Sequence, residues 1–309
     1  MMKTLILKLD GIPDNLEHQL KNDYELIDIH GAISPEQQTN IASATVGVAN
    51  GESQLDASFL RQFPALKLIA IFGVGFDGVD MHYARQNNIA VTNTPGVLTE
   101  DVADLALAFC LALTREVIPA NNFVQQGHWS HSRYPLTTKF SRRKVGIFGM
   151  GRVGQTICRR LSAFDCDVYY TDRNQVDIAA TRVETVQQLA SEVDLLILSA
   201  SASAQTHNVI DLAVLTALGK SGYLVNVARG SLVNQDDLIT ALENNLIAGA
   251  ALDVLAHEPE VPVALQRANV IITPHYASGT KETREAMKNL VSENIRLYLQ
   301  SGKLLTPVS

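Results

Sequence analysis

Short apolar and β-branched runs alternate with amphipathic stretches along the chain, a pattern typical of parallel sheets covered by helices on both faces. The pattern occurs in two series. In the first, we expect strands at Thr4–Leu9, Glu25–Ile29, Thr45–Ala49, Leu66–Phe72 and Ile89–Thr92, with helices near Asn15–Lys21, Asp56–Gln62 and Asp80–Gln86. In the second, we expect strands at Lys144–Phe148, Cys166–Thr171, Leu195–Ser199, Tyr223–Val227, Ile247–Asp253 and Val270–Thr273, with helices between them. The sequence therefore predicts an α/β protein with two doubly wound parallel sheets.

The two series are separated by Thr94-Pro95-Gly96, which interrupts the regular pattern. A long helix is expected next, from about Glu100 to Phe123, with Thr99 as its N-cap. Alanine and leucine are so frequent in this segment that its apolar content exceeds what one buried face needs. We therefore expect this helix to be buried between domains or between subunits.

The composition places the chain among soluble globular proteins, with 309 residues, 46% hydrophobic and 18% charged, enough for about two domains. A formal net charge of -7 argues against binding to a nucleic-acid backbone. The run Arg142-Arg143-Lys144 is expected to be a solvated loop. The most apolar stretch, Leu105–Leu113, is too short to span a membrane, and the apolar run near the N-terminus is too short for a signal peptide. We expect a cytoplasmic protein.

Three cysteines, Cys110, Cys158 and Cys166, are widely spaced and lie in apolar surroundings. Their odd number and spacing favour free, buried thiols over disulfides. None of them has the spacing or the histidine neighbour of a zinc ligand. We expect no metal.

A glycine-rich turn, Gly149-Met150-Gly151-Arg152-Val153-Gly154, follows the first strand of the second series and leads into a helix expected at Gln155–Phe164. In this context Gly149 permits a tight turn, Gly151 lets the backbone approach a pyrophosphate, and Gly154 allows close packing of helix and strand. The N–H groups at the start of the helix are suited to phosphate oxygens. The sequence therefore predicts a dinucleotide site here.

The next strand ends at Asp172, eighteen residues after Gly154. A carboxylate at this place accepts hydrogen bonds from the ribose hydroxyls and repels a 2′-phosphate, which favours NAD over NADP. Arg173 is adjacent and is able to pair with a 2′-phosphate. NADP therefore stays open as the cofactor.

Three residues stand just beyond later strand ends, where ligands of doubly wound sheets bind: Arg229, Glu258 and His275. Hydride transfer to a carbonyl carbon leaves an alkoxide that needs a proton, and an imidazolium such as His275 is a suitable donor. A carboxylate paired with the imidazole stabilises it, which suits Glu258, and a guanidinium binds a substrate carboxylate, which suits Arg229. Taken alone, each of the three residues is better explained as a loop, turn or helix-start residue than as a catalytic group.

Several segments together resemble the D-isomer-specific 2-hydroxyacid dehydrogenase family, and the resemblance covers essentially the whole chain. Two further segments are similar to the branch of glyoxylate, hydroxypyruvate and hydroxyphenylpyruvate reductases. The segments that carry the family resemblance are Gly73–Asp80, Asn93–Asp104, Val145–Gly154, Asn226–Gly230, Ala251–Val254 with His257-Glu258-Pro259, and Thr273-Pro274-His275; those of the branch are Leu136–Ser141 and Ala163–Cys166.

The resemblance implies a flavodoxin-like substrate domain, residues 1–98 with 284–309, and an inserted Rossmann domain for NAD, residues 99–283. It also implies that the helix and arm at about residues 100–140 form a dimerisation region, and hence a homodimer. In the arm, His131 and Arg133 beside Trp129 are explained either as a solvated loop or as groups that reach a substrate.

The resemblance gives Arg229, Glu258 and His275 the roles of catalytic trio. Substrate contacts are implied for Arg229, His275 and the backbone N–H groups of Val74-Gly75-Phe76, where glycine leaves room for close approach. His257, beside Glu258, is an alternative for the acid–base role, but neighbouring side chains point in different directions, so we interpret it as a loop residue. Cofactor contacts are expected from Val102, Gly149, Gly151, Arg152, Val153, Gly154, Asp172, Arg173, Ser199, Ala200, Thr206, Val227, Ala228, Arg229, Asp253, His275 and Ser278.

One departure concerns the cofactor. Members of the hydroxyphenylpyruvate-like branch commonly prefer NADPH and carry a Ser-Arg pair where this chain has Thr171-Asp172-Arg173. We expect NAD because of the acid. The implied activity is hydride transfer between NAD(H) and a small 2-oxo acid/D-2-hydroxy acid pair, with glyoxylate and hydroxypyruvate first. The alternative is an NADH-responsive binding module of the same fold.

Overall fold

The computed structural model describes residues 3–308 and divides the chain into two compact units. The first extends to Leu98 and resumes at Thr280, and the second is Thr99–Gly279. The chain returns to the first unit at Thr280 instead of residue 284. The reason is local, because the Thr280 side chain caps α11 (Lys281–Ser301) by accepting a hydrogen bond from the Thr283 N–H, so that the whole helix belongs to the first unit.

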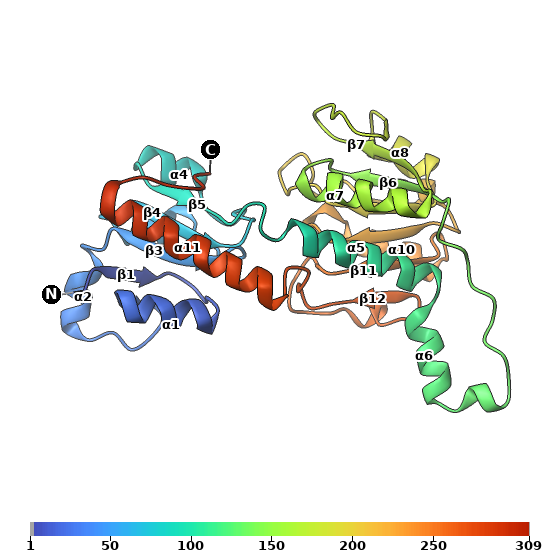
Figure 1. Ribbon diagram of the computed structural model, residues 1–309, viewed down its shortest axis with the longest axis horizontal. Helices are drawn as coiled ribbons and strands as arrows, with labels where there is room; N and C mark the ends of the chain where they lie inside the picture. The colour runs from blue at the N-terminus through green and yellow to red at the C-terminus, as the bar shows by residue number, and fades with distance from the viewer. Residues whose placement is uncertain (1–2, 309) are drawn as a thin grey trace. The chain divides into compact units, whose positions relative to one another are not determined.

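The first unit has a five-stranded parallel sheet, as predicted, and its strand order is β2-β1-β3-β4-β5 (Figure 1). All five expected strands are present. α2 was not predicted, because its sequence has a single large apolar residue and so lacks an apolar stripe. The elements are β1 (Leu5–Lys8), α1 (Asp14–Asp23), β2 (Glu25–Asp28), α2 (Pro35–Ile41), β3 (Val46–Asn50), α3 (Ala57–Leu60), β4 (Leu68–Phe72), α4 (Met81–Gln86), β5 (Ala90–Thr92) and α11.

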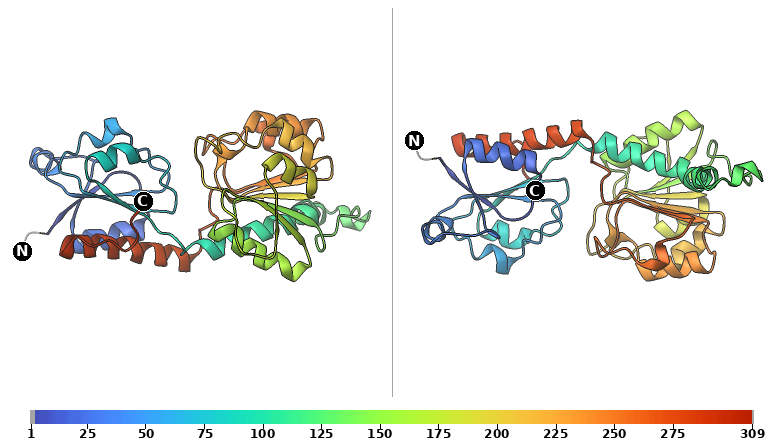
Figure 2. Two further views of the ribbon diagram at one scale, coloured as in Figure 1. Left: turned by 90° about the horizontal axis from the view of Figure 1, so that it is seen from above. Right: turned by 90° about the horizontal axis from the view of Figure 1, so that it is seen from below.

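Both faces of this sheet are covered by helices (Figure 2). Alternate residues of β4 belong to different apolar layers: Leu68 and Phe72 pack with residues of α1 and α11, whereas Ile69 and Ile71 pack with residues of α3 and α4. This two-residue alternation is what a strand buried on both faces requires. The confirmed doubly wound arrangement places the carboxyl ends of all five strands at one edge.

The second unit has a seven-stranded parallel sheet in the order β12-β11-β10-β9-β6-β7-β8 (Figure 1). The strand order reverses beside β6, which neighbours both β7 and β9. In such sheets ligands bind beyond the carboxyl ends of the strands at this reversal. The strands are β6 (Lys144–Phe148), β7 (Asp167–Thr171), β8 (Thr181–Arg182), β9 (Leu195–Leu198), β10 (Tyr223–Asn226), β11 (Gly249–Leu252) and β12 (Val270–Ile272).

The helices of the second unit lie on both faces of its sheet (Figure 2). Only the two-residue edge strand β8 was missed among the strands, because both of its residues are exposed and no apolar run marks it. The helical elements are α5 (Thr99–Thr114), α6 (Val117–Gln125), η1 (His128–Ser130), α7 (Arg152–Leu161), η2 (Ser162–Phe164), α8 (Val186–Glu192), α9 (Leu212–Leu218), η3 (Gly230–Leu232), α10 (Gln235–Glu243) and η4 (Val263–Leu265).

The single long helix expected from Glu100 to Phe123 is wrong. The chain forms α5 and α6, and between them Glu116 takes a left-handed backbone conformation with φ 49°. Pro119 explains the break, because in a continuous helix its missing N–H would leave a carbonyl of the preceding turn without its donor. Thr99 is the first residue of α5, and α7 likewise begins at Arg152 where Gln155 was expected.

Much of α5 is buried against elements of its own unit. It packs against α7 and against strands β10, β11 and β12. Arg160 of α7 pairs with Glu100 and Asp104 on the first turns of α5. These contacts account for the buried apolar residues of α5, and a place for this helix between domains or subunits stays a prediction.

The three cysteines are free thiols. Cys110 and Cys158 are buried as predicted, whereas Cys166 is half-buried because it stands at the turn before β7. Burial raises the pKa of the Cys110 thiol, which keeps it protonated. Within residues 3–308, no helix is both long enough and apolar enough to cross a membrane.

Candidate active site

The glycine-rich turn joins β6 to α7 at the strand-order reversal. Gly149 has φ 96°, and a Cβ there would lie 2.5 Å from the Ala200 backbone. At Gly154 a Cβ would lie 2.1 Å from the Gly149 carbonyl oxygen. A Cβ at Gly151 would meet no atom within 4 Å. Two of the glycines thus permit close backbone contacts, and the third faces open space.

The N-terminus of α7 fits a diphosphate group. In the part of the chain that the structure describes, the N–H groups of Gly151, Arg152 and Val153 have no acceptor. Such N–H groups point along the helix axis and carry the positive end of its dipole. Because Gly151 adds no side chain over them, an anion is able to approach these three donors.

Asp172 ties the glycine turn to the loop after β7. Its Oδ2 accepts from the Met150 N–H at 2.7 Å, and its Oδ1 accepts from the Asn174 N–H at 2.9 Å. Arg173 is exposed beside it. Arg182 of β8 donates to the Asp172 carbonyl oxygen at 3.0 Å, so a second guanidinium lies at this loop. No pattern in the sequence indicated Arg182, because only the pairing of β8 with β7 brings it to this loop.

The other predicted cofactor residues of this unit gather at the same edge of its sheet, except Val102, which is buried on α5. The Ser199 hydroxyl donates to the Gly149 carbonyl oxygen at 2.7 Å and so supports the glycine turn. The residues that follow strand ends are Ser199, Ala200 and Thr206 after β9, Val227, Ala228 and Arg229 after β10, Asp253 after β11, and His275 and Ser278 after β12.

A tight turn after β10 presents Arg229. The buried Asn226 side chain donates to the Arg229 carbonyl oxygen at 2.9 Å and accepts from the Ala228 N–H at 3.0 Å. At Gly230 a Cβ would lie 1.9 Å from the Leu255 carbonyl oxygen. Glycine therefore lets this turn pack directly against the loop that carries Glu258. Neither Asn226 nor Gly230 was predicted as a site residue, although both stand in the segment that carries the family resemblance.

His275 and Glu258 form an ion-pair contact, with 2.8 Å between His275 Nδ1 and Glu258 Oε2. Glu258 Oε1 accepts from the Leu255 N–H at 2.8 Å. Burial opposes the charge of Glu258, but the hydrogen bonds from His275 and Leu255 and the positive charge of Arg229 outweigh it and lower the pKa of Glu258. The carboxylate is therefore ionised at neutral pH and holds the imidazole through Nδ1.

Asp253 holds the loop that carries His275. Its buried carboxylate accepts from the Thr273 hydroxyl at 2.6 Å and from the N–H groups of Tyr276 and Ala277 at 3.0 Å each. The His275 N–H donates to the Asp253 carbonyl oxygen at 2.9 Å, and His275 has φ 48°. A non-glycine residue needs such support in the left-handed region. Asp253 was predicted as a cofactor contact, and the hydrogen bonds give its carboxylate a positioning role.

The three remaining substrate residues lie in the first unit, in the loop after β4. Among residues 3–308, the N–H groups of Val74, Gly75 and Phe76 donate no hydrogen bond. The structure thus brings Arg229, Glu258 and His275 together in one unit, and leaves three unpaired N–H donors in the other.

The remaining candidates are exposed side chains. His257 lies at the surface, and its ring makes no hydrogen bond within residues 3–308. Trp129 is 69% exposed, and His131 and Arg133 are exposed beside it, as expected of a solvated loop. The base of this arm is held by Tyr134, whose hydroxyl donates to Glu116 Oε2 at 2.7 Å.

Comparison with known proteins agrees with this geometry. The family model described as D-isomer specific 2-hydroxyacid dehydrogenase, NAD binding domain, matches residues 107–277. The chain is 39% identical to glyoxylate/hydroxypyruvate reductase A of Arabidopsis thaliana over 98% of each chain, and 40% identical to hydroxyphenylpyruvate reductase of Plectranthus scutellarioides over 84% of each.

Solved structures are similar over nearly the whole chain. An NADPH-dependent glyoxylate/hydroxypyruvate reductase from Sinorhizobium meliloti, in complex with NADP and malonate, has a TM-score of 0.93 and 37% identity, and covers 99% of this chain and 97% of its own. A 2-hydroxyacid dehydrogenase from Ketogulonicigenium vulgare has a TM-score of 0.92 and 34% identity, with 100% and 99% covered.

Proposed function

Because the chain belongs to the D-isomer-specific 2-hydroxyacid dehydrogenase family, we propose that it reduces a small 2-oxo acid with a nicotinamide cofactor and that His275 supplies the proton. The observation that carries this proposal is the contact of 2.8 Å between His275 Nδ1 and Glu258 Oε2, in the unit that also holds the glycine turn. Relatives with reductase names support an enzyme over an NADH-responsive binding module.

In the proposed mechanism Arg229 binds the substrate carboxylate through its guanidinium and polarises the neighbouring carbonyl. Bound nicotinamide supplies the hydride to the keto carbon. His275 donates the proton from Nε2 to the carbonyl oxygen as the alkoxide forms. Glu258 holds the ring through Nδ1 and offsets its positive charge. The Val74-Gly75-Phe76 N–H groups bind the substrate carboxylate in this proposal.

The proposed substrates are glyoxylate and hydroxypyruvate, with phenylpyruvate-like acids behind them, because relatives named for these compounds are 39% and 40% identical. The test is reduction of glyoxylate, hydroxypyruvate, pyruvate, 2-oxobutyrate and 4-hydroxyphenylpyruvate, each with NADH and NADPH. The highest kcat/KM is expected for one of the first two acids. A clear preference for 4-hydroxyphenylpyruvate would contradict the substrate assignment and leave the reaction class intact.

For the cofactor, NAD is the proposed preference, and Asp172→Ser is expected to shift it toward NADPH. The change removes the carboxylate that would repel a 2′-phosphate, while Arg173 and Arg182 remain at the loop. The ratio of kcat/KM values with NADPH and NADH should rise by about tenfold or more, the effect of roughly 1.4 kcal/mol. Asp177→Ser removes an exposed carboxylate nearby and is the control. An unchanged ratio in Asp172→Ser would remove the reason for choosing NAD.

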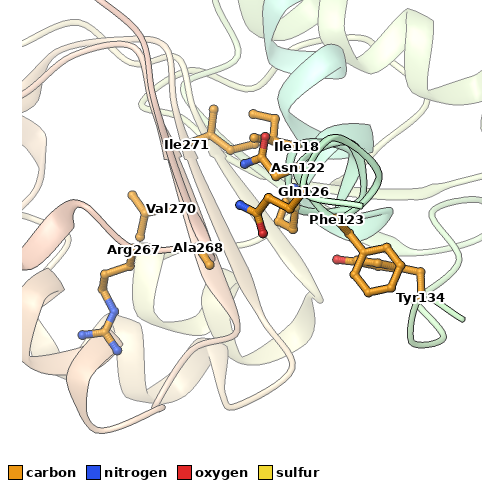
Figure 3. A pocket seen from close by; sticks show the side chains of 10 residues that line it. Ile118, Asn122, Phe123, Gln126, Tyr134, Arg267, Ala268, Val270 and Ile271 are labelled. Atoms are coloured by element: carbon orange, nitrogen blue, oxygen red, sulfur yellow. The ribbon is translucent and has the colours of Figure 1, made fainter. Parts of the chain in front are cut away.

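A homodimer is proposed through α6 and the arm that follows it. Exposed apolar side chains gather there: Val117 is 53% exposed, Ile118 46%, Val124 50%, Trp129 69% and Leu136 100%. Beside them, α6 and the segment entering β12 line an open pocket of about 380 Å³ (Figure 3). Apolar surface of this kind favours association with another protein surface.

The double variant Ile118→Asp/Val124→Asp is expected to convert a dimer into a monomer, because two carboxylates would lose water in the contact. Sedimentation equilibrium of the two proteins measures this. Val263→Asp is the control, since Val263 is 81% exposed on η4 of the same unit. A dimer that survives the double variant would place the contact elsewhere.

A cytoplasmic location is also proposed, and cell fractionation tests it.

A further inference from the structure

The last described residues of the chain fold back onto the sheet of the first unit. Pro307 forms an antiparallel bridge with Thr92 of β5, and the Val308 N–H donates to the Val91 carbonyl oxygen at 2.8 Å. Residues 305–308 therefore lie along the edge strand that leads directly into Asn93.

A buried side chain on α11 fixes this segment. Asn294 is 1% exposed, and its Oδ1 accepts from the N–H groups of Leu305 at 3.0 Å and Thr306 at 3.2 Å. Its Nδ2 donates to Thr306 Oγ1 at 2.9 Å and to the Leu290 carbonyl oxygen at 2.9 Å. All the hydrogen-bonding groups of the amide are used, so Thr306 is held in one orientation.

Thr306 in turn holds Asn93. The Thr306 hydroxyl donates to the Asn93 carbonyl oxygen at 2.6 Å, and the Asn93 N–H donates to the Thr306 carbonyl oxygen at 3.3 Å. The hydroxyl accepts from Asn294 and donates to Asn93, so a chain of hydrogen bonds runs from α11 to the residue that follows β5. Such chains strengthen their members and fix their directions.

Asn93 and Thr94 complete the path to the loop after β4. Asn93 Nδ2 donates to the Val74 carbonyl oxygen at 2.8 Å, and the Thr94 N–H donates to the Gly73 carbonyl oxygen at 2.8 Å. A peptide group is planar and trans, so a carbonyl and the N–H of the next residue point in opposite directions. Holding the carbonyls of Gly73 and Val74 therefore aims the N–H groups of Val74 and Gly75.

We propose that Asn294, Thr306 and Asn93 are positioning residues that set the direction of the Val74 and Gly75 N–H donors, and thereby the affinity for the substrate carboxylate. The inference rests on the proposed function, in which these donors bind that carboxylate. It assigns a role in substrate binding to a segment far from the loop in sequence. In the proposed mechanism none of the three residues binds the substrate or supplies the proton.

The test is Thr306→Val, which keeps the shape of the side chain and removes both hydroxyl hydrogen bonds. The KM for the preferred 2-oxo acid is expected to rise about tenfold, the effect of roughly one or two hydrogen bonds, while kcat and the Kd for NADH change little. Thr306→Ser restores the hydroxyl and should restore KM. Ser301→Ala is the matched control, because it removes a hydroxyl bonded only to its own helix, at Leu297.

Asn93→Ala removes only the last hydrogen bond of the path and gives an independent reading if Thr306→Val does not fold. It should raise KM in the same way. An unchanged KM in a folded Thr306→Val or Asn93→Ala protein would overturn the proposal while wild-type turnover upholds the proposed function. Equal losses in kcat, NADH affinity and thermal stability, without rescue by Thr306→Ser, would also overturn it. A wild-type protein without turnover would overturn the proposed function and, with it, this inference.

Discussion

Replacing His275 with alanine is expected to lower kcat for 2-oxo acid reduction by roughly 10²–10⁴, the usual contribution of a positioned acid–base group. The proton donor is lost, while the glycine turn and the N-terminus of α7 are untouched. The Kd for NADH should therefore stay near the wild-type value. Single-turnover reduction and a fluorescence titration with NADH measure the two quantities separately.

Two further variants sharpen this result. Glu258→Gln keeps a hydrogen-bond acceptor for His275 Nδ1 but removes the charge that stabilises the imidazolium, so its turnover should lie between those of wild type and His275→Ala. His257→Ala is the matched control, because His257 is an exposed histidine of the same loop as Glu258. Near-normal turnover of His275→Ala would assign proton transfer to another group, and His257 would be examined first.

Replacing Arg229 with glutamine is expected to lower kcat/KM by about 10² or more, mainly through a higher KM for the 2-oxo acid. Loss of a partly buried charged partner typically costs about 2–5 kcal/mol, and a guanidinium pairs with a carboxylate through two hydrogen bonds that an amide does not reproduce. Steady-state kinetics over a range of 2-oxo acid concentrations separates the change in KM from the change in kcat. Arg229→Lys keeps the positive charge, so its kcat/KM should fall less than that of Arg229→Gln. An unchanged KM in Arg229→Gln would contradict the assigned role.

The same variant should change the pH dependence. The pKa of Glu258 lies below its ordinary value, so its carboxylate is charged at neutral pH. It loses this charge only when the pH falls through the lowered pKa. The positive charge of Arg229 is one of the causes of the lowering. Without it the pKa of Glu258 rises, and the loss of turnover on the acid side should move to higher pH in Arg229→Gln but not in Arg229→Lys.

Strand positions were readable from the sequence because buried parallel strands are short, continuous apolar runs, as in Leu195–Leu198. The break between α5 and α6 was not predicted, although Pro119 lies in the first turn of α6. The left-handed conformation of Glu116 makes the break, and it does not change the pattern of apolar residues. The exposed β8 and the polar α2 were missed for the same reason. Where apolar periodicity is absent, the sequence carries little information about structure.

The candidate trio was singled out by its place after strand ends and by the chemistry of its side chains, and the family resemblance gave it its catalytic roles. Of the residues that support it, Asn226 and Gly230 were not predicted, and Asp253 was predicted only as a cofactor contact. Asn226 and Asp253 act through hydrogen bonds to backbone groups, and Gly230 acts by leaving room for the Leu255 carbonyl oxygen. These roles depend on distances of a few ångströms between loops, which periodicity does not encode. The hydrogen bonds that connect Asn294 through Thr306 and Asn93 to Val74 were not predictable for the same reason.

The central claim is hydride transfer to the keto carbon of a 2-oxo acid, and isotope transfer tests it most directly. The protein is incubated with glyoxylate or hydroxypyruvate and NADH that carries deuterium at C4 of the nicotinamide, in separate samples for its two faces. NMR then locates the label in the product. We predict deuterium on C2 of the 2-hydroxy acid with one of the two labelled cofactors. NADH that binds without forming any labelled 2-hydroxy acid would contradict the claim and favour a binding module.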